Sequence, residues 1–183
     1  MVANEQAARP TPVVVVMGVS GSGKTTIGAL VADAKSVPFV DADDLHPIDN
    51  VKKMAAGTPL DDEDRWPWLD IVGRRLQEAE ESGEGVVMAC SALRRVYRDR
   101  IRATAPSTIF LHLHGSLEVL TARLEGRSGH FMPPALLSSQ METLEALTED
   151  ETGYVLDIGQ SVEQMIDEAL PALQSIRDEM PRG

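Results

Sequence analysis

The segment Val13–Thr25, VVVVMGVSGSGKT, decides the fold of this 183-residue chain. Its first part, Val13–Met17, is an unbroken apolar run dominated by valine, which is typical of a strand buried on both faces. Its second part, Gly18–Thr25, matches the pattern G-x-x-x-x-G-K-[ST], and the segment Thr25–Ala34 that overlaps its end has helical spacing. A strand, this pattern and a helix in succession indicate a phosphate-binding loop rather than an incidental glycine-rich turn.

The residue types of this loop have separate physical roles. Glycines accept positive φ, so backbone N–H groups can close around phosphate oxygens, and the start of the next helix adds partial positive charge. Lys24 is suited to bridging the β- and γ-phosphates, and the Thr25 hydroxyl to ligating Mg²⁺. We predict a nucleoside triphosphate site built from Gly18, Ser20, Gly21, Ser22, Gly23, Lys24, Thr25 and Thr26.

The loop identifies the nucleotide but not the reaction. A small-molecule kinase, a nucleotide kinase, a GTPase and an ATP-driven machine are all compatible with it. The Asn-Lys-x-Asp pattern that reads a guanine base is absent from the sequence, and so is a long insertion typical of motors. The identity of the second substrate therefore depends on the rest of the chain.

Apolar runs of the same kind recur at Val37–Val40, Val86–Cys90, Ile109–His114 and, more weakly, Tyr154–Ile158. Segments with helical spacing alternate with these runs, at Thr25–Ala34, Arg65–Glu81, Arg94–Ala105, Ser116–Leu124, Pro134–Leu147 and Ser161–Asp178. This alternation predicts right-handed β-α-β units and the α/β class. We expect one three-layer α/β/α domain over residues 12–183, with a central parallel sheet of about five strands, after a flexible start at 1–11.

Composition and charge narrow the function classes. Acidic residues outnumber basic ones 29 to 17, a net charge of −12, which disfavours nucleic acid and anionic membranes as partners. Positive charge gathers in residues 91–140, where 7 bases and 3 acids give +4. The single cysteine, Cys90, fits a reducing compartment, and no secretory or membrane-spanning run is visible, so we expect a cytoplasmic protein.

Carboxylates follow the second predicted strand, where ligands of open α/β sheets bind. Alternation puts Asp41 and Asp43 on the same side of the chain. We predict that Asp41 holds Mg²⁺ through water and that Asp43 orients or deprotonates an acceptor hydroxyl. The alternative is a helix cap in a solvated acidic turn, a role for which Asp44 is better suited than Asp43.

Arginines and a serine supply candidate contacts for an anionic acceptor. Arg65 follows four consecutive acids and is suited to bidentate recognition of a carboxylate, although it could instead neutralise those neighbours. Ser91 lies at the carboxyl end of the third predicted strand, and the cluster Arg94–Arg98 follows it. Some of these arginines are expected to lie on a solvated helix face. Trp66 and Trp68 fit core packing and a pocket wall about equally.

The segment Arg123–Pro133 has the features of a mobile flap. Arg123 and Arg127 are four residues apart, and glycines and a proline follow them. We expect a lid over about residues 124–134 that carries positive charge to the transferring phosphoryl group and excludes water. The pair could also lie on a plain helix face, and His130 is as well suited to a structural role as to a functional one.

Several further blocks are more specific than the phosphate loop. They are Asp41–Pro47 (DADDLHP), Asn50 with Lys53-Met54, Gly57–Leu60 (GTPL), Asp64–Leu69 (DRWPWL), Ala89–Leu93 (ACSAL), Tyr97–Asp99 (YRD), Gly129–Met132 (GHFM) and Ser139-Gln140. Together with the loop they resemble the gluconokinase family over about residues 13–160. The resemblance implies ATP-dependent phosphorylation of D-gluconate on its 6-hydroxyl, with Mg²⁺, in a homodimer whose fold is similar to shikimate and adenylate kinases.

The resemblance also implies roles for individual residues. Asp43 looks like the catalytic carboxylate near the 6-hydroxyl, Lys24 and Arg127 look like the other catalytic groups, and Arg123 and Arg127 look like lid arginines facing ATP. The residues expected to contact gluconate are Asp43, His46, Lys53, Arg65, Ser91, Arg98, His130 and Gln140. A kinase for another sugar acid or for shikimate, and a nucleotide-binding regulatory module without turnover, are the alternatives.

Overall fold

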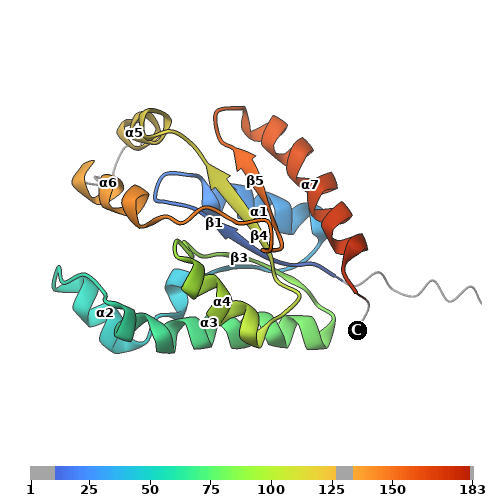
Figure 1. Ribbon diagram of the computed structural model, residues 1–183, viewed down its shortest axis with the longest axis horizontal. Helices are drawn as coiled ribbons and strands as arrows, with labels where there is room; N and C mark the ends of the chain where they lie inside the picture. Colours follow the sequence, from blue (N-terminus) through green and yellow to red (C-terminus); the bar gives the residue numbers. More distant parts are fainter. Residues whose placement is uncertain (1–10, 127–133, 182–183) are drawn as a thin grey trace, which may run out of the picture.

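The computed structural model describes residues 11–126 and 134–181. Its centre is a five-stranded sheet, every pairing of which is parallel, in the order β2-β3-β1-β4-β5 (Figure 1). The strands are β1 Val13–Met17, β2 Phe39–Asp41, β3 Val86–Ala89, β4 Ile109–His114 and β5 Gly153–Asp157. The predicted parallel sheet and α/β class are confirmed, and the strand ends differ from the predicted ends by at most two residues.

Helices cover both faces of this sheet (Figure 1). Their bounds are α1 Lys24–Lys35, α2 Ile48–Ala55, α3 Asp62–Ser82, α4 Arg95–Thr104, α5 Leu117–Glu125, α6 Pro134–Thr143 and α7 Val162–Glu179, with a 3₁₀ turn, η1, at Ala42–Leu45. Side chains of α1 and α7 pack with Val14 and Val16 on one face, and side chains of α3 and α4 pack with Val13, Val15 and Met17 on the other. The strand β1 is therefore buried on both sides, which explains its unbroken apolar run.

The order of the strands determines where ligands can bind. From β1 the chain first runs to β2 and β3 on one side and then to β4 and β5 on the other. The carboxyl end of β1 therefore lies at the point where the strand order reverses, which is where open α/β sheets bind ligands. The segment Gly18–Gly23 begins at this point, so the fold brings the phosphate loop to the crevice.

Three helical predictions need correction. The 3₁₀ turn η1 and the short helix α2 were not predicted, because the Asp- and Pro-rich segment between β2 and α3 lacks a long apolar period. Helix α3 begins at Asp62 instead of Arg65, since Asp61 and Asp64 form a capping box. Helix α6 ends at Thr143 instead of Leu147, after which the Glu145 N–H donates to the carbonyl of Leu93 at 2.8 Å.

Two predictions fall outside the described residues. The flexible start is one of them, since residues 1–10 lie outside that part. The other is most of the expected lid, because the gap between α5 and α6 covers residues 127–133. Within the described part, none of the helices is both long enough and apolar enough to cross a membrane.

Candidate active site

The phosphate loop has the backbone geometry that anion binding requires. Gly18, Gly21 and Gly23 have φ values of 148°, 81° and 96°, in the region that favours glycine. A Cβ on Gly18 would lie 2.9 Å from the carbonyl oxygen of Leu113, so a side chain there would also clash with β4. Gly23 precedes α1 and provides no side-chain cap, which leaves the first N–H groups of α1 available to an anion.

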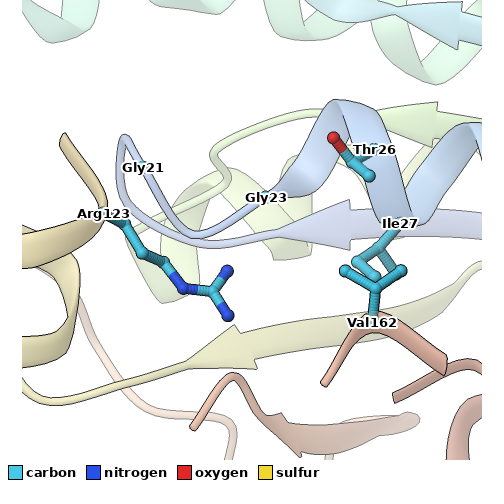
Figure 2. A pocket seen from close by; sticks show the side chains of 6 residues that line it. All are labelled: Gly21, Gly23, Thr26, Ile27, Arg123 and Val162. Carbon is cyan, nitrogen blue, oxygen red and sulfur yellow. The ribbon is translucent and has the colours of Figure 1, made fainter. Parts of the chain in front are cut away.

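A cavity of about 230 Å³ opens beside this loop (Figure 2). Its walls come from the loop, the first turn of α1, α5 and the start of α7, and its lining residues are Gly21, Gly23, Thr26, Ile27, Arg123 and Val162. The guanidinium group of Arg123 points into the cavity (Figure 2). It also donates a hydrogen bond to the carbonyl of Ile158. Arg123 and Thr26, two of the residues predicted to bind the nucleotide, therefore line the same cavity.

Lys24 and Gln140 both contact the loop backbone. The Lys24 ammonium group donates to the carbonyl of Val19 at 3.0 Å. The Ser20 N–H donates to the Oε1 atom of Gln140, which lies on α6, at 2.8 Å. Gln140, a predicted gluconate contact, is therefore bonded in this structure to the predicted phosphate loop. No signal in the sequence links two residues that lie 120 positions apart.

The carboxylates after β2 have different surroundings. Asp41 is the cap of η1, and its Oδ1 atom accepts from the Asp43 N–H at 3.0 Å. The capping role that we expected to suit Asp44 therefore belongs to Asp41. Burial raises the pKa of Asp43, and the neighbouring Asp41 carboxylate raises it further, while His46 and Lys24 act in the opposite direction. A carboxylate with a raised pKa that lies near Lys24 is suited to accepting a proton beside a bound phosphate.

His46 links the Asp43 region to Arg65. Its ring stacks on Trp68 with centroids 4.2 Å apart, and its Nδ1 atom lies 3.3 Å from the Asn50 amide nitrogen. Burial lowers the pKa of His46, and the positive charge of Arg65 lowers it as well, although Asp43 opposes both effects. Trp68 is buried, and its Nε1–H donates to the carbonyl of Ala42 at 2.8 Å. This bond fixes the first residue of η1 against α3.

Arg65 lies in a cluster that also contains Asp62, Arg94 and Tyr97. The Nη1 atom of Arg65 donates to the Tyr97 hydroxyl at 3.3 Å, and that hydroxyl donates to Asp62 at 2.5 Å. Arg94 donates to the other Asp62 oxygen at 2.7 Å. The sequence points to Arg65 and, through the block Tyr97–Asp99, to Tyr97, but no pattern in it separates Asp62 from the other acids before Arg65. The spacing of Arg94 and Tyr97, three residues apart in a helical segment, is a signal that they share a face.

Lys53 and Ser91 occupy different parts of the site. Lys53 donates to Asp64 at 2.5 Å and so ties α2 to the first turn of α3, whereas Lys52 is exposed. The backbone of Ser91 meets the phosphate loop, because its carbonyl accepts from the Gly18 N–H at 3.3 Å. Ala92 follows with a φ of 44°, in a turn that lies three residues beyond the carboxyl end of β3.

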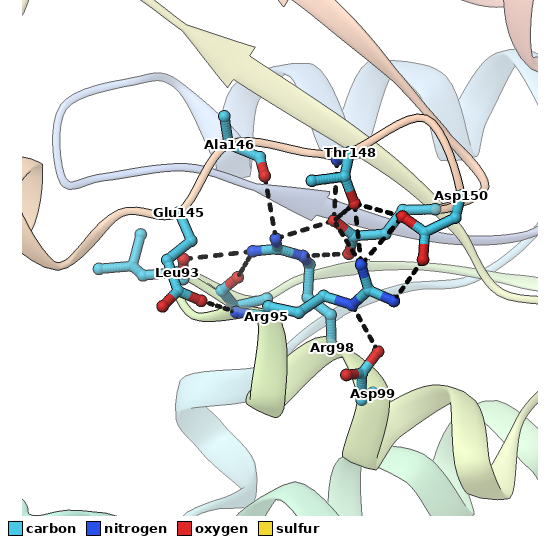
Figure 3. A network of polar contacts seen from close by, with 10 residues as sticks. Leu93, Arg95, Arg98, Asp99, Glu145, Ala146, Thr148 and Asp150 are labelled. Carbon is cyan, nitrogen blue, oxygen red and sulfur yellow. Dashed lines mark hydrogen bonds and ion pairs between the residues drawn. The ribbon is translucent and has the colours of Figure 1, made fainter.

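Arg98 is not available to a substrate, which corrects our prediction. Its side chain has 0% exposure and forms an ion pair with Glu151, with Nε–Oε1 and Nη2–Oε2 distances of 2.6 and 3.0 Å (Figure 3). Its Nη1 atom donates to the carbonyls of Ala92 and Leu93 at 2.9 and 3.2 Å. Arg98 therefore fixes the turn after Ser91 from inside the protein.

The remaining predicted residues concern the lid and the metal. Arg127 and His130 lie outside the described residues. In the described part of the chain, no group of three or more His, Cys, Asp or Glu side chains could hold a metal ion by itself. The donor set of Thr25 and Asp41 fits Mg²⁺, which commonly keeps several waters and takes the rest of its ligands from substrate phosphates.

Comparisons with known proteins agree with this geometry. The family model for shikimate kinase matches residues 20–172. The probable gluconokinase of Xenopus tropicalis is 42% identical over 85% of this chain and 90% of its own. The thermosensitive gluconokinase of Escherichia coli K12 is 44% identical, over 89% and 88% of the two chains.

Solved structures give the same result. The crystal structure of a gluconokinase from Sinorhizobium meliloti 1021 is 46% identical, with a TM-score of 0.84 over 93% of this chain and 95% of that one. The APS kinase of Mycobacterium tuberculosis is only 17% identical, with a TM-score of 0.62, and shows the shared fold alone. The phosphate loop, the carboxylates after β2 and these similarities lead to one conclusion: the chain belongs to the gluconokinase family.

Proposed function

We propose that this protein is a gluconokinase, which transfers the γ-phosphoryl group of ATP to the 6-hydroxyl of D-gluconate and releases ADP and 6-phospho-D-gluconate. One arrangement carries the proposal: Lys24 of the phosphate loop lies close enough to Asp43 to act on its pKa, and His46 lies within electrostatic reach of both Asp43 and Arg65 of the arginine cluster. In such a site the loop can bind a triphosphate, Asp43 an acceptor hydroxyl, and the arginine cluster the carboxylate of the acceptor. The relatives named gluconokinase make gluconate the best candidate acceptor.

The transfer itself requires mainly positioning and electrostatic stabilisation. The backbone N–H groups of the loop and the Lys24 ammonium group hold the β- and γ-phosphates. Asp43 accepts the proton of the 6-hydroxyl as that oxygen forms its bond to the γ-phosphorus. The bond from this phosphorus to the bridging oxygen breaks at the same time, and ADP leaves with the electron pair.

Other residues of the proposed site bind and shield the reactants. Mg²⁺, held by Thr25 and through water by Asp41, would neutralise phosphate charge when it is bound. Arg123 is proposed to contact ATP from the cavity wall, and Arg127 to reach the transferring group. At the acceptor, Arg65 is proposed to bind the carboxylate. The proposed contacts with the hydroxyl chain are His46, Lys53, Ser91 and His130.

The assembly and location of the protein are part of the same proposal. The family resemblance leads us to propose a homodimer that works in the cytoplasm. Light scattering of the purified protein measures the first of these directly. A mass equal to one chain of 19.8 kDa would contradict the dimer without affecting the proposed reaction.

An acceptor panel tests the proposed reaction. ADP release is measured with gluconate, other aldonates, shikimate and nucleoside monophosphates, each against the ATPase background. We expect gluconate to give the highest kcat/KM, and Asp43→Asn to reduce kcat by a factor of about 100 or more while ATP still binds. Stimulation by shikimate or a nucleoside monophosphate but not by gluconate would contradict the proposal.

A further inference from the structure

Two arginine–aspartate pairs connect α3 with α4, one through Arg94, the N-cap residue of α4, and one through Arg100. They differ in how many hydrogen bonds the arginine makes to its aspartate. Arg100 makes a bidentate pair with Asp70, with distances of 2.7 and 2.9 Å. Asp62 instead accepts from both Arg94, at 2.7 Å, and Tyr97, at 2.5 Å, and lies 3.8 Å from Arg65. Asp62 is thus hydrogen-bonded to one guanidinium group, that of Arg94, with Arg65 as a second cation nearby, whereas both Asp70 oxygens are bonded to Arg100, with Arg74 adding positive charge nearby.

The cluster of Asp62, Arg65, Arg94 and Tyr97 contains one more positive charge than negative charge. Arg65 and Arg94 together carry two positive charges against the single negative charge of Asp62, and Tyr97 is neutral. In the described part of the chain, the side chain of Arg65 makes one hydrogen bond, to the Tyr97 hydroxyl at 3.3 Å. A guanidinium group has five N–H donors, so most of those on Arg65 are left for another acceptor.

The two arginines are also arranged around a common surface. Their Cζ atoms lie 5.6 and 5.5 Å from the centroid of the Tyr97 ring. The side chains of Arg65, Arg94 and Asp62 are 33%, 36% and 38% exposed, so a ligand from solvent can reach all three. Arg65 is close enough to His46 to lower the pKa of that ring, and His46 in turn acts on Asp43. The cluster is therefore continuous with the proposed acceptor site.

We propose that Arg65 and Arg94 form a two-arginine receptor for the carboxylate of the acceptor, and that Asp62 occupies this receptor as an internal counter-ion until the acceptor displaces it. The proposal rests on the proposed function and adds two residues to it. Arg94 becomes a substrate-binding residue, and Asp62 becomes a residue that sets affinity and specificity. A neutral polyol cannot compete with Asp62, whereas an aldonate carries the same charged group and can.

The other two arginines of the cluster Arg94–Arg98 have most of their donors bonded within the protein. Arg98 is buried against Glu151, and Arg95 is held by Asp99 at 2.7 Å and by Asp150 at 2.9 and 3.1 Å (Figure 3). The hydrogen bond from Tyr97 and the charge of Arg94 hold the pKa of Asp62 below its usual value, although partial burial opposes them. Asp62 is therefore ionised at neutral pH, and the competition takes place between two carboxylates.

Two substitutions test the proposal, each with a matched control. Arg94→Gln is compared with Arg100→Gln, which breaks the other α4–α3 pair. Asp62→Asn is compared with Glu63→Gln, which removes the neighbouring exposed charge from the same helical turn. For each variant we measure the KM values for gluconate and ATP by ADP release. Calorimetry measures binding of gluconate and of its neutral analogue glucitol without the need for turnover.

Opposite effects are expected from the two substitutions. Arg94→Gln should raise the KM for gluconate about tenfold or more, because a charged hydrogen bond is lost. Asp62→Asn should lower it about threefold, since a partly exposed competitor is removed. Both controls, and the KM for ATP in all variants, should stay within about twofold of the original protein. Arg94→Lys should give an intermediate increase, because it keeps the charge but not the planar fork.

Two results would overturn the proposal. One is a KM for gluconate in Arg94→Gln that stays within twofold of the value for the original protein. If Arg94→Gln folds poorly, the same result in Arg94→Lys would overturn the proposal. The other is an increase in that KM in Asp62→Asn, which would make Asp62 a positioning residue instead of a competitor. Binding of gluconate that depends on Arg94 without phosphoryl transfer would contradict the proposed function alone. Absence of gluconate binding by calorimetry would contradict both.

Discussion

Arg94 and Arg98 are four residues apart, yet their side chains have opposite relations to the protein. Every N–H of the Arg98 guanidinium group has an acceptor, two on Glu151 and one each on the carbonyls of Ala92, Leu93 and Ala146 (Figure 3). Arg94 and its neighbour Arg65 are about one third exposed and share one carboxylate. A cation can bind a ligand only with donors that the fold leaves over. We therefore expect the interior region, Arg98 with Glu151, to stabilise the fold. We expect the open region, Arg65 and Arg94 with Asp62, to recognise the acceptor.

The largest effect should come from the interior region. Arg98→Ala leaves Glu151 buried at 2% side-chain exposure without its partner, and removal of one member of such a pair costs about 3–5 kcal/mol of unfolding free energy. Denaturant unfolding measures this loss. A matched change in the open region, Arg65→Ala, should cost about 1 kcal/mol or less. Equal losses in the two variants would remove the distinction between the regions.

For the KM for gluconate, in contrast to the unfolding free energy, we expect the larger effect in the open region. Arg65→Ala should raise the KM for gluconate by a factor of about 10–100, because the acceptor carboxylate loses a charge-assisted hydrogen bond. The KM for ATP should change little. Steady-state ADP release with each substrate varied in turn separates the two constants. An increase confined to the KM for ATP would place Arg65 on the nucleotide side and contradict the assignment.

Gln140 provides a smaller test on the nucleotide side of the site. Its bond to the Ser20 N–H predicts that Gln140→Ala raises the KM for ATP about two- to tenfold, the value of one neutral hydrogen bond. The KM for gluconate should not change. The adjacent exposed residue Ser139 provides the control Ser139→Ala. An effect on the KM for gluconate alone would contradict this role and support the gluconate contact that the sequence predicts for Gln140.

The smallest expected effect is a difference in pH dependence. Burial opposes ionisation of Glu151, but hydrogen bonds from Arg98 and from the Thr148 N–H outweigh it and hold the pKa below the ordinary 4.5. A carboxylate with a depressed pKa stabilises the fold above its unfolded pKa, and this stability is lost as pH falls through the folded pKa. The gap in unfolding free energy between the original protein and Glu151→Gln should therefore shrink below pH 4.5. A gap independent of pH would contradict the role of this carboxylate.

The sequence predicts the fold better than the site, for a physical reason. Strands such as β1 are buried on both faces, so their own residues record their environment. The start of α3 was misplaced by three residues because its acids form the first turn and its capping box. The role of Arg98 was mistaken because its partner Glu151 lies 53 residues away. Local patterns thus identify elements and loops, whereas contacts between distant residues decide which charged groups are paired within the protein and which can bind a ligand.

The most direct test of the account is the product formed from ATP and gluconate, followed by ³¹P NMR with glucitol as the neutral comparison. We expect a single phosphate monoester on carbon 6 of gluconate and very little ester from glucitol. In Asp43→Asn, the initial rate at which this signal grows should fall by a factor of about 100 or more. Release of inorganic phosphate without an ester, or an ester formed equally well on glucitol, would contradict it.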